Sequence, residues 1–146
     1  MIVLDTNVVS EPMRREPDPG VVAWLDAQVT DELYITSVTA AELMHGVERH
    51  PPGRRRSQLA DAIADLLDID FGGRILPFDV SAAFDYSIVM GARDLGGVPI
   101  GMADAMIAAV VLSTGAEALA TRNTKDFEGI GLHLVDPWTT SPLATS

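Results

Sequence analysis

MIVLDTNVVSE, residues 1–11, opens the chain and decides the predicted fold. Residues 2–4 are apolar and predict a short buried β-strand. A carboxylate, a hydroxyl and an amide follow directly as Asp5, Thr6 and Asn7, and apolar residues then resume. One explanation of this polar step is that Asp5 or Thr6 caps a following helix, because both side chains accept hydrogen bonds from free helix N–H groups. The alternative is that the strand ends in functional residues.

Beyond this stretch, short apolar segments alternate with longer segments of helical periodicity. Strands are predicted over residues 33–36, 75–78, 118–121 and 133–135, and helices over residues 21–28, 39–50, 59–70, 84–95 and 101–113. In the helix over residues 84–95, Phe84, Ile88, Gly91 and Leu95 recur at helical spacing. Strands separated by helices predict an α/β fold with a mostly parallel central sheet flanked by helices.

Length and composition limit the class of protein. A chain of 146 residues without a linker or repeat predicts one domain, which we expect over residues 1–138, with residues 139–146 as a loose tail. No apolar run reaches the roughly 18 residues of a membrane span, and no secretory signal is evident. The absence of cysteine excludes disulfides and thiolate metal sites. We therefore expect a cytoplasmic protein without a membrane partner.

The formal net charge of −11 argues against simple binding to nucleic acid, because phosphate neutralisation supplies most of that affinity. Two explanations are open. Nucleic acid is not a ligand, or the acids gather where divalent cations bind and the cations attract phosphate. The main basic runs, Arg54-Arg55-Arg56 and Arg14-Arg15, are interpreted as solvated surface in preference to an RNA track.

Oxygen-bearing side chains follow several of the predicted strands or begin the next helix. They are Asp5, Glu42, Asp104, Asn123 and Asp126. Sites in parallel α/β sheets form beyond the carboxyl ends of the strands, so these residues are expected to converge at one edge. Carboxylates that crowd together repel one another unless a cation lies between them. Oxygen ligands without cysteine favour Mg²⁺ or Mn²⁺ over Zn²⁺. The scattered His45, His50 and His133 are assigned no zinc role.

Each of these residues also has a purely structural interpretation. Glu42 follows Thr39 by three residues, which fits a capping box in the first turn of a helix. Asp104 lies near a helix start, where an acid complements the macrodipole. Its neighbours are apolar, however, and a partly buried charge needs a partner. Asn123 and Asp126 fit turns.

Four motifs in this order resemble the PIN-domain ribonucleases. They are LDTN at residues 4–7, T-x-x-E-L at residues 39–43, GMADAMIAA at residues 101–109 and ATRN-x-x-DF at residues 120–127. Each motif alone is weak, but the ordered set is specific and spans almost the whole chain. The sequence is most similar to the VapC toxins of type II toxin–antitoxin modules, in particular to their FitB-like branch.

The resemblance implies a PIN-like fold and a metal-dependent endoribonuclease that hydrolyses RNA phosphodiester bonds. Its catalytic set would be Asp5, Glu42, Asp104, Asn123 and Asp126, with Asp5, Glu42 and Asp104 as ligands of Mg²⁺, for which Mn²⁺ substitutes. Supporting roles would fall to Thr6, Asn7 and Thr121. Many family members have Asp where this chain has Asn123, which weakens the case for a second metal ion unless Asp126 reaches the site. Whether Glu42 is a ligand or a base stays open.

The resemblance also implies three partners: an RNA substrate, a VapB-like antitoxin and a second copy of the chain in a homodimer. Two other functions are alternatives. A haloacid-dehalogenase-like phosphatase also has an Asp after its first strand, but it needs a second Asp where this chain has Asn7. A catalytically weak PIN domain that serves as a partner-binding module is favoured only by Asn123.

Overall fold

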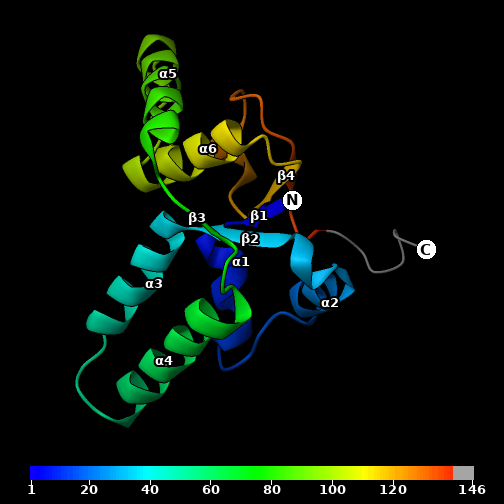
Figure 1. Cartoon of the computed structure of the whole chain (residues 1–146), viewed down its shortest axis with the longest axis vertical. Helices are drawn as coiled ribbons and strands as arrows, with labels where there is room; N and C mark the ends of the chain where they lie inside the picture. Colours follow the sequence, from blue (N-terminus) through cyan, green and yellow to red (C-terminus); the bar gives the residue numbers. More distant parts are fainter. Residues whose placement is uncertain (140–146) are drawn as a thin grey trace.

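A computed structural model describes residues 1–139 and contains one sheet of five parallel strands in the order β3-β2-β1-β4-β5 (Figure 1). The strands are β1 (Ile2–Leu4), β2 (Leu33–Thr36), β3 (Ile75–Leu76), β4 (Ala118–Ala120) and β5 (Leu134–Val135). β1 is the central strand, and it pairs with β2 on one side and β4 on the other. Residues directly after β1 therefore lie in the middle of the carboxyl edge of the sheet.

Helices connect all of these strands. They are α1 (Thr6–Ser10), α2 (Pro19–Ala27), α3 (Ser37–Glu48), α4 (Arg54–Asp65), α5 (Val80–Gly96) and α6 (Met102–Thr114), with short helical turns η1 (Glu11–Met13), η2 (Thr30–Glu32), η3 (Leu66–Asp70) and η4 (Thr124–Phe127). Within residues 1–139, no helix combines the length and the apolar character needed to cross a membrane.

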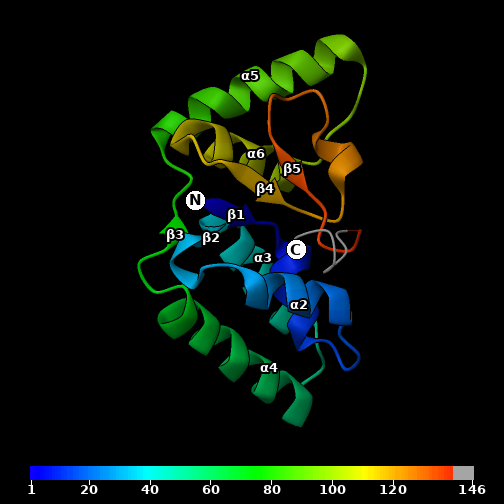
Figure 2. The same ribbon diagram turned by 90° about the vertical axis from the view of Figure 1, so that its right-hand side faces the viewer.

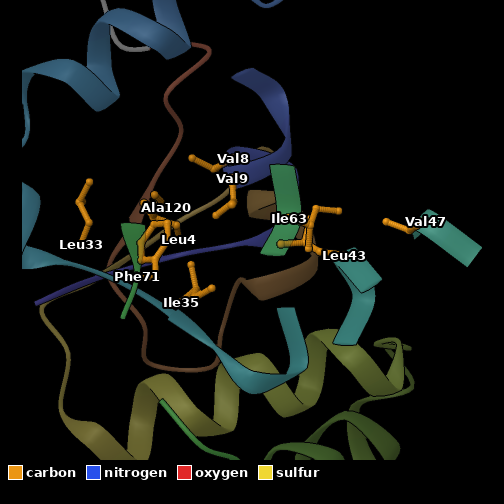
Figure 3. Close-up of a cluster of buried hydrophobic side chains, with 10 residues drawn as sticks. All are labelled: Leu4, Val8, Val9, Leu33, Ile35, Leu43, Val47, Ile63, Phe71 and Ala120. Atoms are coloured by element: carbon orange, nitrogen blue, oxygen red, sulfur yellow. The ribbon is translucent and has the colours of Figure 1, made fainter. Parts of the chain in front are cut away.

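The alternation of side chains along β1 divides the core into two clusters. Leu4 belongs to a cluster with Val8 of α1, Leu43 of α3 and Ile63 of α4 (Figure 3). Val3 points to the other face, where Ile107 and other residues of α6 cover the sheet. Val3 and Leu4 are adjacent in β1 and therefore pack against helices on opposite faces of the sheet.

Helix α5 lies outside α6, on the side away from the sheet (Figure 2). The buried residues of α5 are Ala82 and Val89, and both have small side chains. The apolar stripe identified in the sequence faces outward instead: Phe84, Ile88 and Leu95 are 70%, 68% and 93% exposed. The helix is confirmed, but these side chains do not contribute to the core of the chain.

The predicted fold class and the five strands are confirmed, and the helix boundaries shift by a few residues. A difference that bears on the site is at α3, which begins at Ser37 because Thr36 is its N-cap and accepts a hydrogen bond from the Thr39 N–H at 3.1 Å. The capping-box interpretation of Thr39 and Glu42 is therefore wrong, and Glu42 lies in the second turn. Apart from Thr139, the predicted tail lies outside the described residues, and the single domain over residues 1–138 stays a prediction.

Candidate functional site

Asp5 lies at the carboxyl end of β1 and is only 3% exposed. Its Oδ1 accepts a hydrogen bond from the Thr6 N–H at 2.8 Å, which makes it the N-cap of α1, as one of the two sequence interpretations predicted. Its Oδ2 accepts a second bond from the Thr121 hydroxyl at 2.7 Å. Burial raises the pKa of Asp5, while the bonds from Thr121 and Thr6 oppose the rise. The two hydrogen bonds thus hold the Asp5 carboxylate in place, but they do not fully offset the effect of burial on its pKa.

Thr121 and Asn7 connect Asp5 to the loop after β4. The fully buried Thr121 hydroxyl accepts a bond from the Asn123 N–H at 3.0 Å while donating to Asp5. Asn7 Oδ1 accepts from the Arg122 N–H at 3.3 Å, and the Asn7 amide lies 3.5 Å from Asp5 Oδ2. These contacts fix the Asp5 carboxylate relative to the neighbouring strand.

Glu42 is connected to this site through Thr6. The Thr6 hydroxyl donates to Glu42 Oε1 at 2.7 Å and is also hydrogen-bonded to the Thr39 hydroxyl at 3.0 Å. A hydroxyl has one proton, so when Thr6 donates to Glu42 it must accept from Thr39. Thr39 is completely buried and was missed as a site residue. Its spacing from Glu42 was the available signal, since residues three apart share a helix face.

Asp104 is in the first turn of α6 and is partly buried among apolar neighbours. Burial raises the pKa of its carboxyl to about 6, with further increases from the negative charges of Asp5, Asp126 and Glu42. Among the described residues, the Asp104 carboxylate has no hydrogen bond or ion pair to offset this repulsion. The four acids therefore lie within electrostatic range of one another, as the sequence predicted.

The donor set fits a hard divalent cation, because it consists of carboxylate oxygens with no cationic side chain paired to any of the four acids in residues 1–139. In that part of the chain, however, no three His, Asp or Glu side chains stand close enough to hold one ion together. Joint ligation therefore requires these side chains to move from the positions described, and Glu42 and Asp104 are both partly exposed.

The two predicted residues after β4 take different positions. Asn123 contributes its backbone N–H through Thr121, whereas its side chain is exposed and makes no hydrogen bond within the described chain. Asp126 is also exposed, yet its charge raises the pKa values of Asp5 and Asp104. Asp126 is thus better placed than the Asn123 side chain to act on the acids.

The parallel sheet and the acids at its carboxyl edge define an α/β protein with a group of acidic side chains at the strand ends. The family model of the PIN domain matches residues 2–131, so the chain belongs to the PIN-domain family.

Similar proteins cover nearly the full chain. The VapC ribonuclease Y4jK of Sinorhizobium fredii is 42% identical, with 94% of this chain and 98% of that protein aligned. Toxin FitB of Neisseria gonorrhoeae is 37% identical over 94% of this chain and 99% of its own length. The crystal structure of FitAcB from Neisseria gonorrhoeae matches with a TM-score of 0.90 and 36% identity, and 96% of this chain and 100% of that chain are covered.

The pKa of Asp104 makes the stability of the metal-free protein depend on pH. The folded-state pKa of about 6 lies above the ordinary value of 3.8, so the folded state keeps a proton that the unfolded state releases. The resulting stabilisation is complete below pH 3.8 and is lost as the pH rises through 6. We expect Asp104→Asn to unfold at higher urea concentration than the parent at pH 7.5, and this advantage should shrink at pH 4.5. Urea unfolding in EDTA measures both.

The matched control is Asp61→Asn, the same chemical change at an exposed position on α4. Its difference from the parent should stay constant between the two pH values. An Asp104→Asn effect that is equally constant would show that the Asp104 carboxyl is not strained by its surroundings.

Proposed function

We propose that this protein is the toxin component of a type II toxin–antitoxin system and a Mg²⁺-dependent endoribonuclease of the hydrolase class. The observation that carries the proposal is the group of four acids at the carboxyl edge of the sheet, in which Asp5, Glu42 and Asp126 surround Asp104. Proteins similar over nearly the whole chain are named VapC ribonuclease, toxin FitB and tRNA(fMet)-specific endonuclease VapC. PIN-domain ribonucleases are metal-dependent in general, and a cytoplasmic location belongs to this proposal because the substrate is cellular RNA.

Asp5, Asp104 and Glu42 would hold the metal ion. A bound Mg²⁺ would offset the charge of the phosphate and lower the pKa of its bound water. Mn²⁺ would substitute, because both ions accept hard oxygen ligands. Thr6 would orient Glu42, and Thr121 would orient Asp5, through the hydrogen bonds that they already donate. Asp126 adds negative charge next to these acids.

This assignment also accounts for the net charge of −11. An acidic site repels phosphate while it is empty. A bound cation reverses the local charge, and the site then attracts the phosphate. The similar proteins named above are ribonucleases and toxins, which favours these functions over the phosphatase alternative, and the Asn7 amide contacts Asp5 where phosphatase chemistry needs a second acid. The partner-binding alternative is separated from the ribonuclease by the cleavage assay below.

Replacing a ligand should abolish cleavage without unfolding the chain. We expect Asp5→Asn and Asp104→Asn to lower the rate of RNA cleavage more than about 100-fold, since even partners of ligands contribute about 10–100-fold in metal sites. Thr121→Val should fall within that smaller range. The measurement is cleavage of total RNA with Mg²⁺ present, followed on denaturing gels.

Asp61→Asn again serves as the control and should cleave like the parent. If Asp5→Asn and Asp104→Asn also cleave like the parent, the site assignment is contradicted. If the Mg²⁺-loaded parent leaves all RNA intact, the ribonuclease proposal fails and a partner-binding role replaces it.

The proposal includes a small VapB-like antitoxin. Solved structures similar to this chain include "Structure of FitAB bound to IR36 DNA fragment", at 35% identity and a TM-score of 0.90. In this chain, the acids around Asp104 would attract a basic antitoxin segment, and an Arg side chain suits paired carboxylates through its bidentate fork. Such a residue would take the place of the cation and so inhibit the enzyme.

A homodimer is also part of the proposal, and α5 is its suggested interface. Val80, Phe84, Ile88 and Leu95 are 74%, 70%, 68% and 93% exposed, and at about 100° per residue they fall on one side of the helix. The 17 residues of α5 give this apolar stripe a length of about 25 Å. A long stripe of this kind pairs with its own copy across a two-fold axis, since both copies offer the same surface.

A charge in the middle of the stripe should therefore separate the dimer. Ile88→Glu is expected to run as a monomer in size-exclusion chromatography with light scattering, where the parent runs as a dimer. Ile69→Glu places the same charge at a residue of η3 that is 73% exposed and should leave the dimer intact. A monomeric parent at micromolar concentration would remove this interface.

A further inference from the structure

A cavity of about 310 Å³ lies beside the acidic site, between α1, α3 and α4. Thr6 and Glu42 of the acidic site form part of its wall. The rest of the wall combines basic and apolar side chains. The basic residues are Arg14, Arg49, His50 and Arg55, the apolar ones are Met13, Leu43, Leu59 and Ile63, and Ser10 and Gly46 complete the wall. We call this cavity the arginine pocket.

Two of its arginines have uncompensated charge. Within residues 1–139, neither Arg49 nor Arg55 forms an ion pair or a side-chain hydrogen bond. Arg14 is different, because its Nη1 lies 3.1 Å from Oε1 of the buried Glu11 and is largely neutralised. The free positive charge of the pocket therefore comes from Arg49, directly after α3, and from Arg55 of α4.

The placement of basic residues in this chain is strongly uneven. The chain has 10 Lys and Arg residues. Six of them are in the three segments that border the arginine pocket, at positions 14, 15, 49, 54, 55 and 56. Because the net charge is −11, a basic cluster here is not a consequence of a generally basic surface. The cluster instead distinguishes this part of the surface electrostatically from the acidic site next to it.

The start of α4 adds to the positive potential. The helix has 12 residues and begins at Arg54, and no side chain caps its N-terminus at Gly53. Its first N–H groups therefore carry the positive partial charge of the helix end, which favours an anion. Arg55, the second residue of the helix, lies in the wall of the pocket.

We propose that the arginine pocket binds a backbone phosphate of single-stranded RNA next to the phosphate that enters the acidic site. This inference rests on the proposed ribonuclease function. Arg side chains match the geometry of phosphate oxygens, and the shared wall of Thr6 and Glu42 makes the two sites continuous for one strand. Arg55, which belongs to a basic run interpreted from sequence as solvated surface, thus acquires a ligand.

The residues that line the pocket also indicate that it does not recognise the bases of the RNA. It contains no Phe, Tyr or Trp side chain on which a base could stack, and its one imidazole is that of His50. Phosphate contacts position a nucleic acid, whereas base contacts select its sequence. The arginine pocket therefore fixes the position of the strand relative to the carboxylates, and its contribution to affinity is the same for different RNA sequences.

The test is binding of fluorescein-labelled single-stranded RNA oligonucleotides of three unrelated sequences to the Mg²⁺-loaded protein, followed by anisotropy, with RNA integrity checked on gels. We expect the double variant Arg49→Ala with Arg55→Ala to raise Kd about tenfold for every sequence. The slope of log affinity against log salt should fall by about 0.7, the value for one phosphate contact on a single strand. Arg55→Lys should lie between parent and Arg55→Ala, since it keeps the charge without the fork.

Arg54→Ala is the matched control for the single variant Arg55→Ala, because each removes one positive charge from an exposed residue at the start of α4 and only Arg55 lies in the wall of the pocket. It should change Kd less than threefold, and unchanged thermal unfolding of all variants confirms their fold. Parent-like RNA binding by the double variant would overturn the inference while leaving cleavage by the parent, and so the proposed function, intact. The inference is also overturned, and the proposed function left intact, if the double variant weakens binding of the antitoxin but not of RNA. A parent that neither binds nor cleaves RNA would remove both proposals.

Discussion

The burial of the Asp5 carboxylate is the constraint on which this structure depends. A charge that is 3% exposed is costly unless it is hydrogen-bonded and balanced. Thr6 and Thr121 supply the hydrogen bonds, and they fix the start of α1 and the end of β4 relative to the central strand. No basic side chain in the described part of the chain supplies the balancing charge. The polypeptide thus fixes the position of the carboxylate without supplying, among the described residues, a cationic side chain that balances its charge.

Much of the fold follows from local patterns in the sequence. β1 is short and apolar on both faces, which is typical of a strand buried between two layers of helices, and Val3 and Leu4 do pack on opposite faces. The start of α3 was predicted wrongly because two threonines, Thr36 and Thr39, both suit a cap, and strand pairing extends only to Thr36. The exposed stripe of α5 was not foreseeable either, since helical periodicity identifies an apolar face without identifying what covers it.

The same distinction applies to the sites. Asp5, Glu42 and Asp104 could be predicted because each stands at a recognisable point, the end of a strand or the early turns of a helix, and parallel topology brings those points together. The relay from Thr39 through Thr6 to Glu42 depends on side-chain directions that spacing alone does not give. The arginine pocket depends on how α1, α3 and α4 pack against one another, which the spacing of residues within one element does not give.

The central claim is that the acids around Asp104 form a site whose missing charge is that of a divalent cation. Calorimetric titration of the metal-free protein with Mn²⁺, repeated in buffers of different ionisation enthalpy, tests it most directly because it counts the protons released on binding. The pKa of Asp104 is raised to about 6, so binding should release about half a proton per chain from this group at pH 6 and almost none at pH 8. Tighter binding at pH 8 than at pH 6 should accompany this change. Absence of binding, or binding with the same affinity and no proton release at both pH values, would contradict the account.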